Sequence, residues 1–383
     1  MNRTKQNFIL CFTFLLIVGF ACKRSTSSQS NQNAETPNTA NINGDTGKDQ
    51  KPKRDPNEKV FRGSIYVNSG PSSFVMKLKR EGNQLTGSYY YLKTHKDISL
   101  KGSIDGQGKF TMQETSEGNV TGTFTGDWKD SETEPVVYLE GQWKKAGSTD
   151  EWAFNATEQT VETTGDQTIE DKTIKEENKQ KKLSVSVFYP QISGFGAQTD
   201  AINKDIASTI NRGVADFKKE LDCTGVGEDI SCSYEVDYNT MIAKDDFLSF
   251  VFGIYTYSGG AHPNTNTVTL AYDVKSGNRL KLRDLFKPNS NYLKTISDYS
   301  IEALKKHLKE IGGDDPDEEM LKEGAGAKED NYVSWGVSKK GLIIYFDPYQ
   351  VAAYALGPQM VVVPYSVLKD KVKEDGALSP FIK

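Results

Sequence analysis

Hydrophobic and polar positions divide the chain into segments with different periods. From Val60 to Phe154, apolar residues alternate with polar ones in short runs separated by glycine-containing turns. Alternation with a period of two is typical of half-buried strands, and glycine marks places where a strand bends or packs closely. Residues 60–154 are therefore predicted to form an all-β domain, a small barrel or a sandwich. The pattern apolar-x-Gly-x-apolar recurs in this region at Phe61–Ile65, Leu85–Tyr89, Leu100–Ile104, Val120–Phe124 and Leu139–Trp143.

From Leu183 onwards, strand and helix periods are mixed. Steps of three and four between apolar residues predict a helix over 202–221, capped by Thr199, and a second helix from Ser290 to 311. Runs of strands and helices without strict alternation favour an α+β domain over 183–383. The strands expected there are 183–189, 234–238, 247–257, 267–273, 341–346 and 359–363, with a last short helix at 366–372.

Two polar segments separate these regions from the N-terminus and from each other. Residues 22–59 contain Ile42 as their single large apolar side chain, which is too little to offset the entropy of folding, so this segment is predicted to be a disordered tether. Residues 155–182 contain no aromatic residue and are rich in Thr, Glu, Asp and Lys. We interpret them as a linker with one edge strand near 168–175.

The first residues have the features of an export signal. Arg3 and Lys5 precede the apolar run Phe8–Ala21, which ends directly before Cys22. As a helix this run would be about 21 Å long, too short for a hydrocarbon core of about 30 Å. The segment resembles a bacterial lipoprotein signal. That resemblance implies a signal peptide over 1–21, acylation of Cys22, and a location outside the cytoplasm, at an outer membrane or cell surface. An ordinary cleaved signal beside a chance cysteine is the alternative.

The remaining cysteines that follow the signal are Cys223 and Cys232. An even pair in an exported chain predicts a disulfide. A metal site is the weaker alternative, because no other cysteine and no histidine lies near the pair in sequence. We expect no metal and no cofactor.

One series of motifs in the C-terminal region is specific. Tyr189–Ile192, Ser258–Asn264, Gly277–Phe286, Gly341–Pro358 and Val363–Tyr365 follow one another in an order and spacing that resemble the extracytoplasmic domain shared by the anti-sigma factor RsiV and the peptidoglycan deacetylase PdaC. The resemblance covers about residues 183–375. It implies an α+β fold and a cell-envelope setting. In the RsiV branch it also implies direct binding of lysozyme.

Two of these motifs supply candidate ligand-binding residues. Gly259 and Gly260 permit a tight turn, Pro263 stiffens its exit, and His262 between them is either a ligand contact or a structural histidine. The loop Tyr349–Pro358 displays Tyr349 and Tyr354, aromatic side chains that suit either an interface or a core.

Catalytic signatures are scarce. The sequence has no Gly-x-Ser-x-Gly elbow, no phosphate loop and no deacetylase Asp-Asp motif, and its three histidines are far apart. A net charge of −5 without a basic block argues against nucleic-acid binding. We therefore expect a protein that is not an enzyme and that binds a lysozyme-type muramidase or peptidoglycan. A glycan hydrolase using acidic residues and a purely structural envelope protein are the alternatives.

Overall fold

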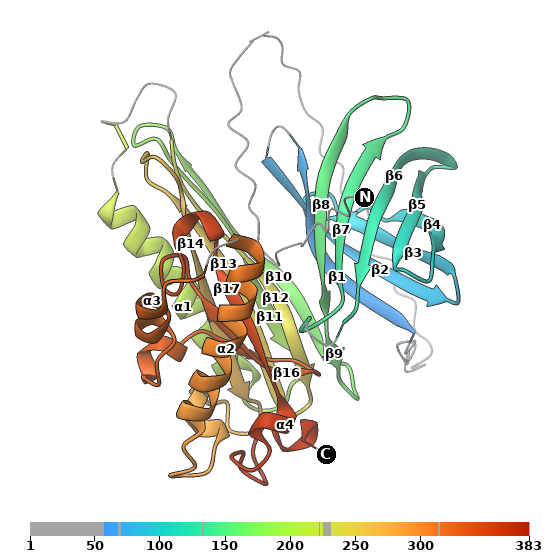
Figure 1. The fold of residues 1–383 in the computed structure, drawn as a ribbon. Helices are drawn as coiled ribbons and strands as arrows, with labels where there is room; N and C mark the ends of the chain where they lie inside the picture. Colours follow the sequence, from blue (N-terminus) through green and yellow to red (C-terminus); the bar gives the residue numbers. More distant parts are fainter. Residues whose placement is uncertain are drawn as a thin grey trace, which may run out of the picture.

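The structure is a computed structural model that describes residues 57–67, 70–131, 134–221, 223–224, 231–312 and 315–382. The predicted signal peptide, Cys22 and nearly all of the predicted tether lie outside the described residues. Two units follow one another along the chain: an N-terminal barrel and a C-terminal unit made of sheets and helices (Figure 1). Among the described residues, no helix is long and apolar enough to cross a membrane.

The N-terminal unit is a closed antiparallel barrel, which decides between the barrel and the sandwich that the sequence left open. Each strand pairs with the next, and the last strand pairs with the first through partners such as Ile65 and Phe154. The strands are β1 (Glu58–Val67), β2 (Gly70–Glu81), β3 (Gln84–Tyr91), β4 (Ile98–Ile104), β5 (Lys109–Ser116), β6 (Asn119–Lys129), β7 (Tyr138–Lys145) and β8 (Glu151–Gln159).

The recurring glycines let neighbouring barrel strands approach closely. A Cβ on Gly102 would lie 1.9 Å from the carbonyl oxygen of Thr111 on β5, and one on Gly141 would lie 2.0 Å from that of Thr125 on β6. No real Cβ tolerates such distances, so glycine at these positions is a packing requirement. The interior is filled by the alternating apolar residues, with Phe74 and Phe124 fully buried among them.

One charged side chain lies inside the barrel. Glu114 is 2% exposed, and its Oε2 accepts hydrogen bonds from the hydroxyl of Tyr89 at 2.5 Å and from Nε1 of Trp143 at 2.8 Å. These two donors compensate for removing the carboxylate from water. Glu114 is thus a structural part of the barrel core.

The segment 155–182 is built into the fold, which corrects its interpretation as a linker. Strand β8 continues to Gln159, β9 (Val161–Glu162) pairs with β12, and β10 (Thr168–Asn178) pairs with β11 along its whole length. The edge strand expected near 168–175 is therefore present and longer than expected. Only its full length was missed, because an exposed, charged edge strand carries little apolar signal.

The central sheet of the C-terminal unit is mixed. Its order is β10–β11–β12–β13–β14, with β11 and β12 parallel and their connection made by helix α1 (Thr199–Glu220). Helix α1 buries Ile202, Ile206 and Ile210, the stripe that the sequence predicted. Its cap position is Gln198, not Thr199, whose hydroxyl donates to the carbonyl of Gly196. The strands are β11 (Leu183–Ser193), β12 (Cys232–Lys244), β13 (Phe247–Tyr257) and β14 (Asn264–Asp273).

A second, three-stranded antiparallel sheet completes the C-terminal unit. It consists of β15 (Trp335–Val337), β16 (Gly341–Phe346) and β17 (Gln359–Pro364), and it packs with helix α2 (Tyr292–Gly312) around a common core. Helix α3 (Glu318–Gly324) begins at an N-cap, Asp317, which accepts from the backbone of Glu319 and Met320. The last predicted helix is reduced to α4 (Tyr365–Leu368). The C-terminal unit is therefore largely β with some helices, a more strand-rich form of the predicted α+β class.

Barrel and mixed sheet are joined by a buried arginine. Arg62 on β1 points out of the barrel, yet its side chain is only 4% exposed. Its Nη1 lies 2.6 Å from Oδ1 of Asp171 on β10, its Nε donates to Asp237 on β12 at 2.9 Å, and its guanidinium lies over the ring of Tyr238. Burial alone would lower the pKa of Arg62, but Asp237, Tyr238 and Asp171 together raise it above its ordinary value. The guanidinium thus stays charged between the units.

Candidate functional site

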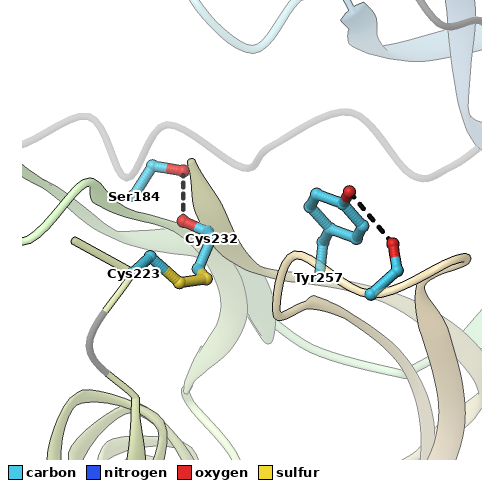
Figure 2. The surroundings of a disulfide bond; sticks show 5 residues. Ser184, Cys223, Cys232 and Tyr257 are labelled. Carbon is cyan, nitrogen blue, oxygen red and sulfur yellow. Dashed lines mark hydrogen bonds between the residues drawn. A yellow bond between two sulfur atoms is a disulfide. The ribbon is translucent and has the colours of Figure 1, made fainter. Parts of the chain in front are cut away.

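Residues Ser258–Pro263, from the predicted motif Ser258–Asn264, connect β13 to β14. Gly259 has a φ of +82°, a conformation that side chains with a Cβ rarely adopt, so glycine is required there. Gly260 has no such requirement, since a Cβ on it would meet nothing within 4 Å. Its carbonyl accepts a hydrogen bond from the hydroxyl of Tyr257 at 3.2 Å, drawn as a dashed line in Figure 2. The turn is thereby held to the end of the strand before it.

The predicted loop at the end of β16 is fixed at its base. Asp347 accepts hydrogen bonds from the backbone nitrogen of Thr267 at 2.8 Å and from Asn266 at 3.1 Å, both on β14. Gln350 donates to the carbonyl of Gly324 at the end of α3 at 2.9 Å. Between these anchors, Tyr349 has a φ of +70° and is 56% exposed. An exposed tyrosine held in an unfavourable backbone conformation is the kind of strain that functional sites keep.

The structure brings the turn and the loop into direct contact. The rings of His262 and Tyr354 stack at a centroid distance of 3.9 Å, and the ring of Tyr349 lies 5.4 Å from that of Tyr354. We refer to these three side chains as the aromatic platform. All the candidate ligand-binding residues therefore lie in one place: the platform itself and, in the turn beside it, Gly259, Gly260 and Pro263.

One carbonyl oxygen organises the platform. Pro263 accepts a hydrogen bond from the hydroxyl of Tyr354 at 2.6 Å and contacts Nδ1 of His262 at 2.9 Å. Because a carbonyl can only accept, Nδ1 of His262 carries a proton, which leaves Nε2 free to accept one. The pKa of the Tyr354 hydroxyl is raised, first by burial and then by the neighbouring Tyr349. The platform thus presents the rings of two tyrosines beside one imidazole.

The disulfide prediction is confirmed: Cys223 and Cys232 are bonded, with their Cα atoms 6.0 Å apart. Because the two sulfurs bind each other, the metal alternative for this pair is excluded. Figure 2 shows the bond beside Ser184, whose hydroxyl donates to the carbonyl of Cys232. Ser233, which directly follows Cys232 on β12, pairs with Tyr257 on β13. The disulfide therefore fixes the end of the sheet from which the turn extends.

Sequence reasoning missed residues that support this site. Tyr255 and Tyr257 lie on one face of β13. Burial raises the pKa of Tyr255, and Glu235, Tyr257 and the nearby Tyr354 raise it further. The alternation Tyr255-x-Tyr257 directly before the glycine pair is the signal that could have revealed them. Within the described residues, no group of three or more His, Cys, Asp or Glu side chains is arranged to hold a metal ion.

Comparison with known proteins shows that parts of the C-terminal unit are similar to two family models. A family model described as deacetylase PdaC matches residues 176–265, and one described as a protein of unknown function, DUF3298, matches residues 283–366. Together they support a PdaC-type extracytoplasmic domain. The platform draws on both matches, since His262 lies within the first while Tyr349 and Tyr354 lie within the second.

A curated relative points in the same direction. Over 139 residues the chain is 37% identical to the peptidoglycan-N-acetylmuramic acid deacetylase PdaC of Bacillus subtilis. The aligned region is 36% of this chain and 29% of the length of that deacetylase. This similarity overturns our prediction that the chain is not an enzyme, because the relative is named for an enzymatic activity on peptidoglycan.

Solved structures of the DUF3298 family also match. A family protein from Pseudomonas aeruginosa has a TM-score of 0.39 and 15% identity, covering 54% of this chain and 94% of the other. A member from Bacteroides fragilis has a TM-score of 0.36 and 16% identity, covering 58% of this chain and 99% of the other.

Proposed function

We propose that this protein is an extracytoplasmic envelope protein that acts on peptidoglycan and binds its glycan through the aromatic platform. The observation that carries the proposal is the stacking of His262 on Tyr354. Together with the hydrogen bond from Tyr354 to Pro263, a residue 91 positions away, it joins two segments that each lie in a region matched by one of the two family models.

The chemistry of the platform suits a sugar ring. A pyranose has faces of C–H groups and a rim of hydroxyl and amide groups, so it packs on flat aromatic rings while its rim forms hydrogen bonds. Tyr349 offers an exposed ring, and His262, which is stacked on Tyr354, offers Nε2 as an acceptor. The same nitrogen is the group of the platform that could serve as a general base if the bound glycan is also processed.

A muramidase is the second candidate ligand, and the exposure of Tyr349 favours it. A tyrosine that is 56% exposed and held rigidly is a suitable anchor for a protein partner, since it buries a large area at little entropic cost. The chain carries a net charge of −5, so attraction to a basic muramidase would accelerate encounter and weaken with salt.

The experiment is a sedimentation assay of the purified protein with peptidoglycan sacculi, together with a direct binding titration against hen lysozyme and a measurement of acetate released from the sacculi. Co-sedimentation that soluble glycan fragments compete away supports the proposal. Acetate release above a protein-free control would add deacetylation to binding. Absence of both co-sedimentation and acetate release, beside micromolar binding of lysozyme, would replace peptidoglycan by a muramidase as the ligand.

We further propose that Cys22 is acylated and anchors the chain to a bacterial membrane. The support is the short apolar run that ends at Cys22 and the polar segment behind it. Expression of the full chain with Cys22→Ser should move it from the membrane fraction to the soluble extracytoplasmic fraction. A variant that still fractionates with membranes like its parent would contradict the anchor.

A further inference from the structure

A cavity lies where the three sheets meet. It has a volume of about 90 Å³ and lies beside a small apolar cluster that includes Val136 and Val251. The barrel, the mixed sheet and the three-stranded sheet each contribute to its wall. Such junctions between units are frequent positions for small-molecule sites. Among its lining residues are Tyr66 and Asn155 of the barrel, Asp237 and Gly253 of the mixed sheet, and Tyr345 and Met360 of the three-stranded sheet.

Gly253 keeps the cavity open. It lies in the middle of β13, directly opposite Asp237 of β12, on the same strand face as Val251. A Cβ on Gly253 would meet nothing within 4 Å, so the glycine does not relieve a clash. A glycine inside a strand costs stability, and open space in front of it is typical of a position that a ligand approaches.

Besides Nη2 of Arg62, which forms an ion pair with Asp237 at 2.8 Å but no hydrogen bond, two polar groups on the cavity wall lack good partners. The hydroxyl of Tyr345 belongs to a buried side chain, and its hydrogen-bond partner is the sulfur of Met241 at 3.8 Å, a weak acceptor. The carboxyl group of Glu134 is partly buried and makes no hydrogen bond or ion pair with any described residue. Buried polar groups without partners are costly, which points to a ligand that satisfies them.

The charges around the cavity favour a cation. Arg62, the positive residue on the wall, is already shared between Asp171 and Asp237. Lys129 and Lys340 lower the pKa of Glu134 against the effect of its burial. Both lysines also form ion pairs elsewhere, Lys340 with Asp130 and Lys129 with Glu140. Among the charged residues of the wall, Glu134 is therefore the one without an ion pair to any described residue.

From this geometry we infer that the junction binds a primary amine carried on a short apolar stem. The ammonium group would pair with Glu134 and donate to the hydroxyl of Tyr345, while the stem would lie against Met241 and Met360. An anion is disfavoured because the wall carries two carboxylates, Glu134 and Asp237, and its arginine is ion-paired with Asp171 and Asp237, whereas an alcohol would leave Glu134 without an ion pair. The inference is independent of the aromatic platform, which shares no residue with this cavity.

The test uses full-length mature protein with ¹³C-labelled methionine methyl groups and three probes of equal length: hexylamine, hexanol and hexanoate. Met241 and Met360 line the cavity, whereas Met76 and Met112 lie in the barrel core and serve as internal references. Hexylamine at millimolar concentration should shift the signals of Met241 and Met360 alone, and should bind about tenfold more tightly than hexanol. Equal binding of hexylamine and hexanol, or no shift with hexylamine at tens of millimolar, would overturn the inference.

Two variants and a control locate the site. Gly253→Leu should fill the cavity and abolish the hexylamine shifts, while Gly106→Leu, at an exposed turn where a Cβ also meets nothing, should leave them unchanged. Glu134→Gln should weaken hexylamine about tenfold and leave hexanol unaffected. Unchanged reference signals of Met76 and Met112 would show that each variant is folded. Hexylamine shifts that persist in Gly253→Leu would contradict the site, whatever the outcome with sacculi.

Discussion

Nη1 of Arg62, on a barrel strand, lies 2.6 Å from Oδ1 of Asp171 on the edge strand of the mixed sheet, and the arginine side chain is 4% exposed. This buried contact fixes the orientation of the barrel relative to the mixed sheet. Breaking a buried ion pair leaves an uncompensated charge, so Arg62→Met should lower the free energy of unfolding by about 2–4 kcal/mol. Urea unfolding followed by circular dichroism measures the loss.

A matched control for Arg62 is Lys109, whose pair with Asp127 lies on the barrel surface with the lysine 63% exposed. Lys109→Met should change stability by less than about 1 kcal/mol. Light proteolysis of Arg62→Met should also cleave between the units faster than in the parent. If both variants are equally stable, the arginine does not hold the units together.

The buried carboxylate of the barrel gives a second prediction. Glu114→Leu leaves the hydroxyl of Tyr89 and Nε1 of Trp143 without an acceptor, which should cost about 2–4 kcal/mol. Glu114→Gln keeps an acceptor oxygen and should cost about half as much. Tryptophan fluorescence is suited to measuring the unfolding of the barrel, because Trp128, Trp143 and Trp152 are all in barrel strands. A Leu variant as stable as its parent would show that the network contributes nothing.

The disulfide should stabilise the end of the sheet that carries the turn. Replacing Cys223 and Cys232 by Ser should lower the free energy of unfolding by roughly 2–3 kcal/mol through the restored entropy of the unfolded loop. Alkylation and mass spectrometry of exported protein under non-reducing conditions should find neither thiol free. Two free thiols would mean that the bond does not form in the cell.

Glu134 predicts a dependence on pH. Burial raises the pKa of its carboxyl group, so the folded protein binds this proton more readily than the unfolded chain does. The contribution of Glu134 to stability is therefore favourable at low pH and is lost as the pH rises through the raised pKa. Glu134→Gln should raise Tm at pH 7.5 and have little effect at pH 4. The exposed Glu117, whose pKa Lys96 lowers, provides a control in which Glu117→Gln should not raise Tm.

Strong local patterns predicted much of the fold. The bounds of β13 and β16 were predicted to the residue, since apolar runs end there at turn-forming residues. The three-residue β15 is too short to produce a periodic signal. Helix α3, with seven residues, was missed for the same reason; Glu318 and Glu319 form its first turn after the Asp317 cap.

The site was predictable in its parts but not in its assembly. The glycine pair and the Tyr349–Pro358 loop each stand out in the sequence, because their residue types suit tight turns and displayed rings. Their contact depends on how β14 and β16 pack, as in the bonds from Thr267 and Asn266 to Asp347, and such long-range pairing leaves no local trace. The role of Arg62 was hidden for the same reason.

The central claim is that the aromatic platform binds the glycan of peptidoglycan. Its most direct test is the affinity of the double variant Tyr349→Ala, Tyr354→Ala for sacculi and for soluble glycan fragments, measured by sedimentation and calorimetry. We predict that the double variant loses roughly 2 kcal/mol or more of binding free energy, with an unchanged circular dichroism spectrum. As a control, Tyr257→Phe, which removes one hydroxyl beside the platform, should retain most of the affinity. A folded double variant that binds glycan as tightly as its parent would contradict the claim.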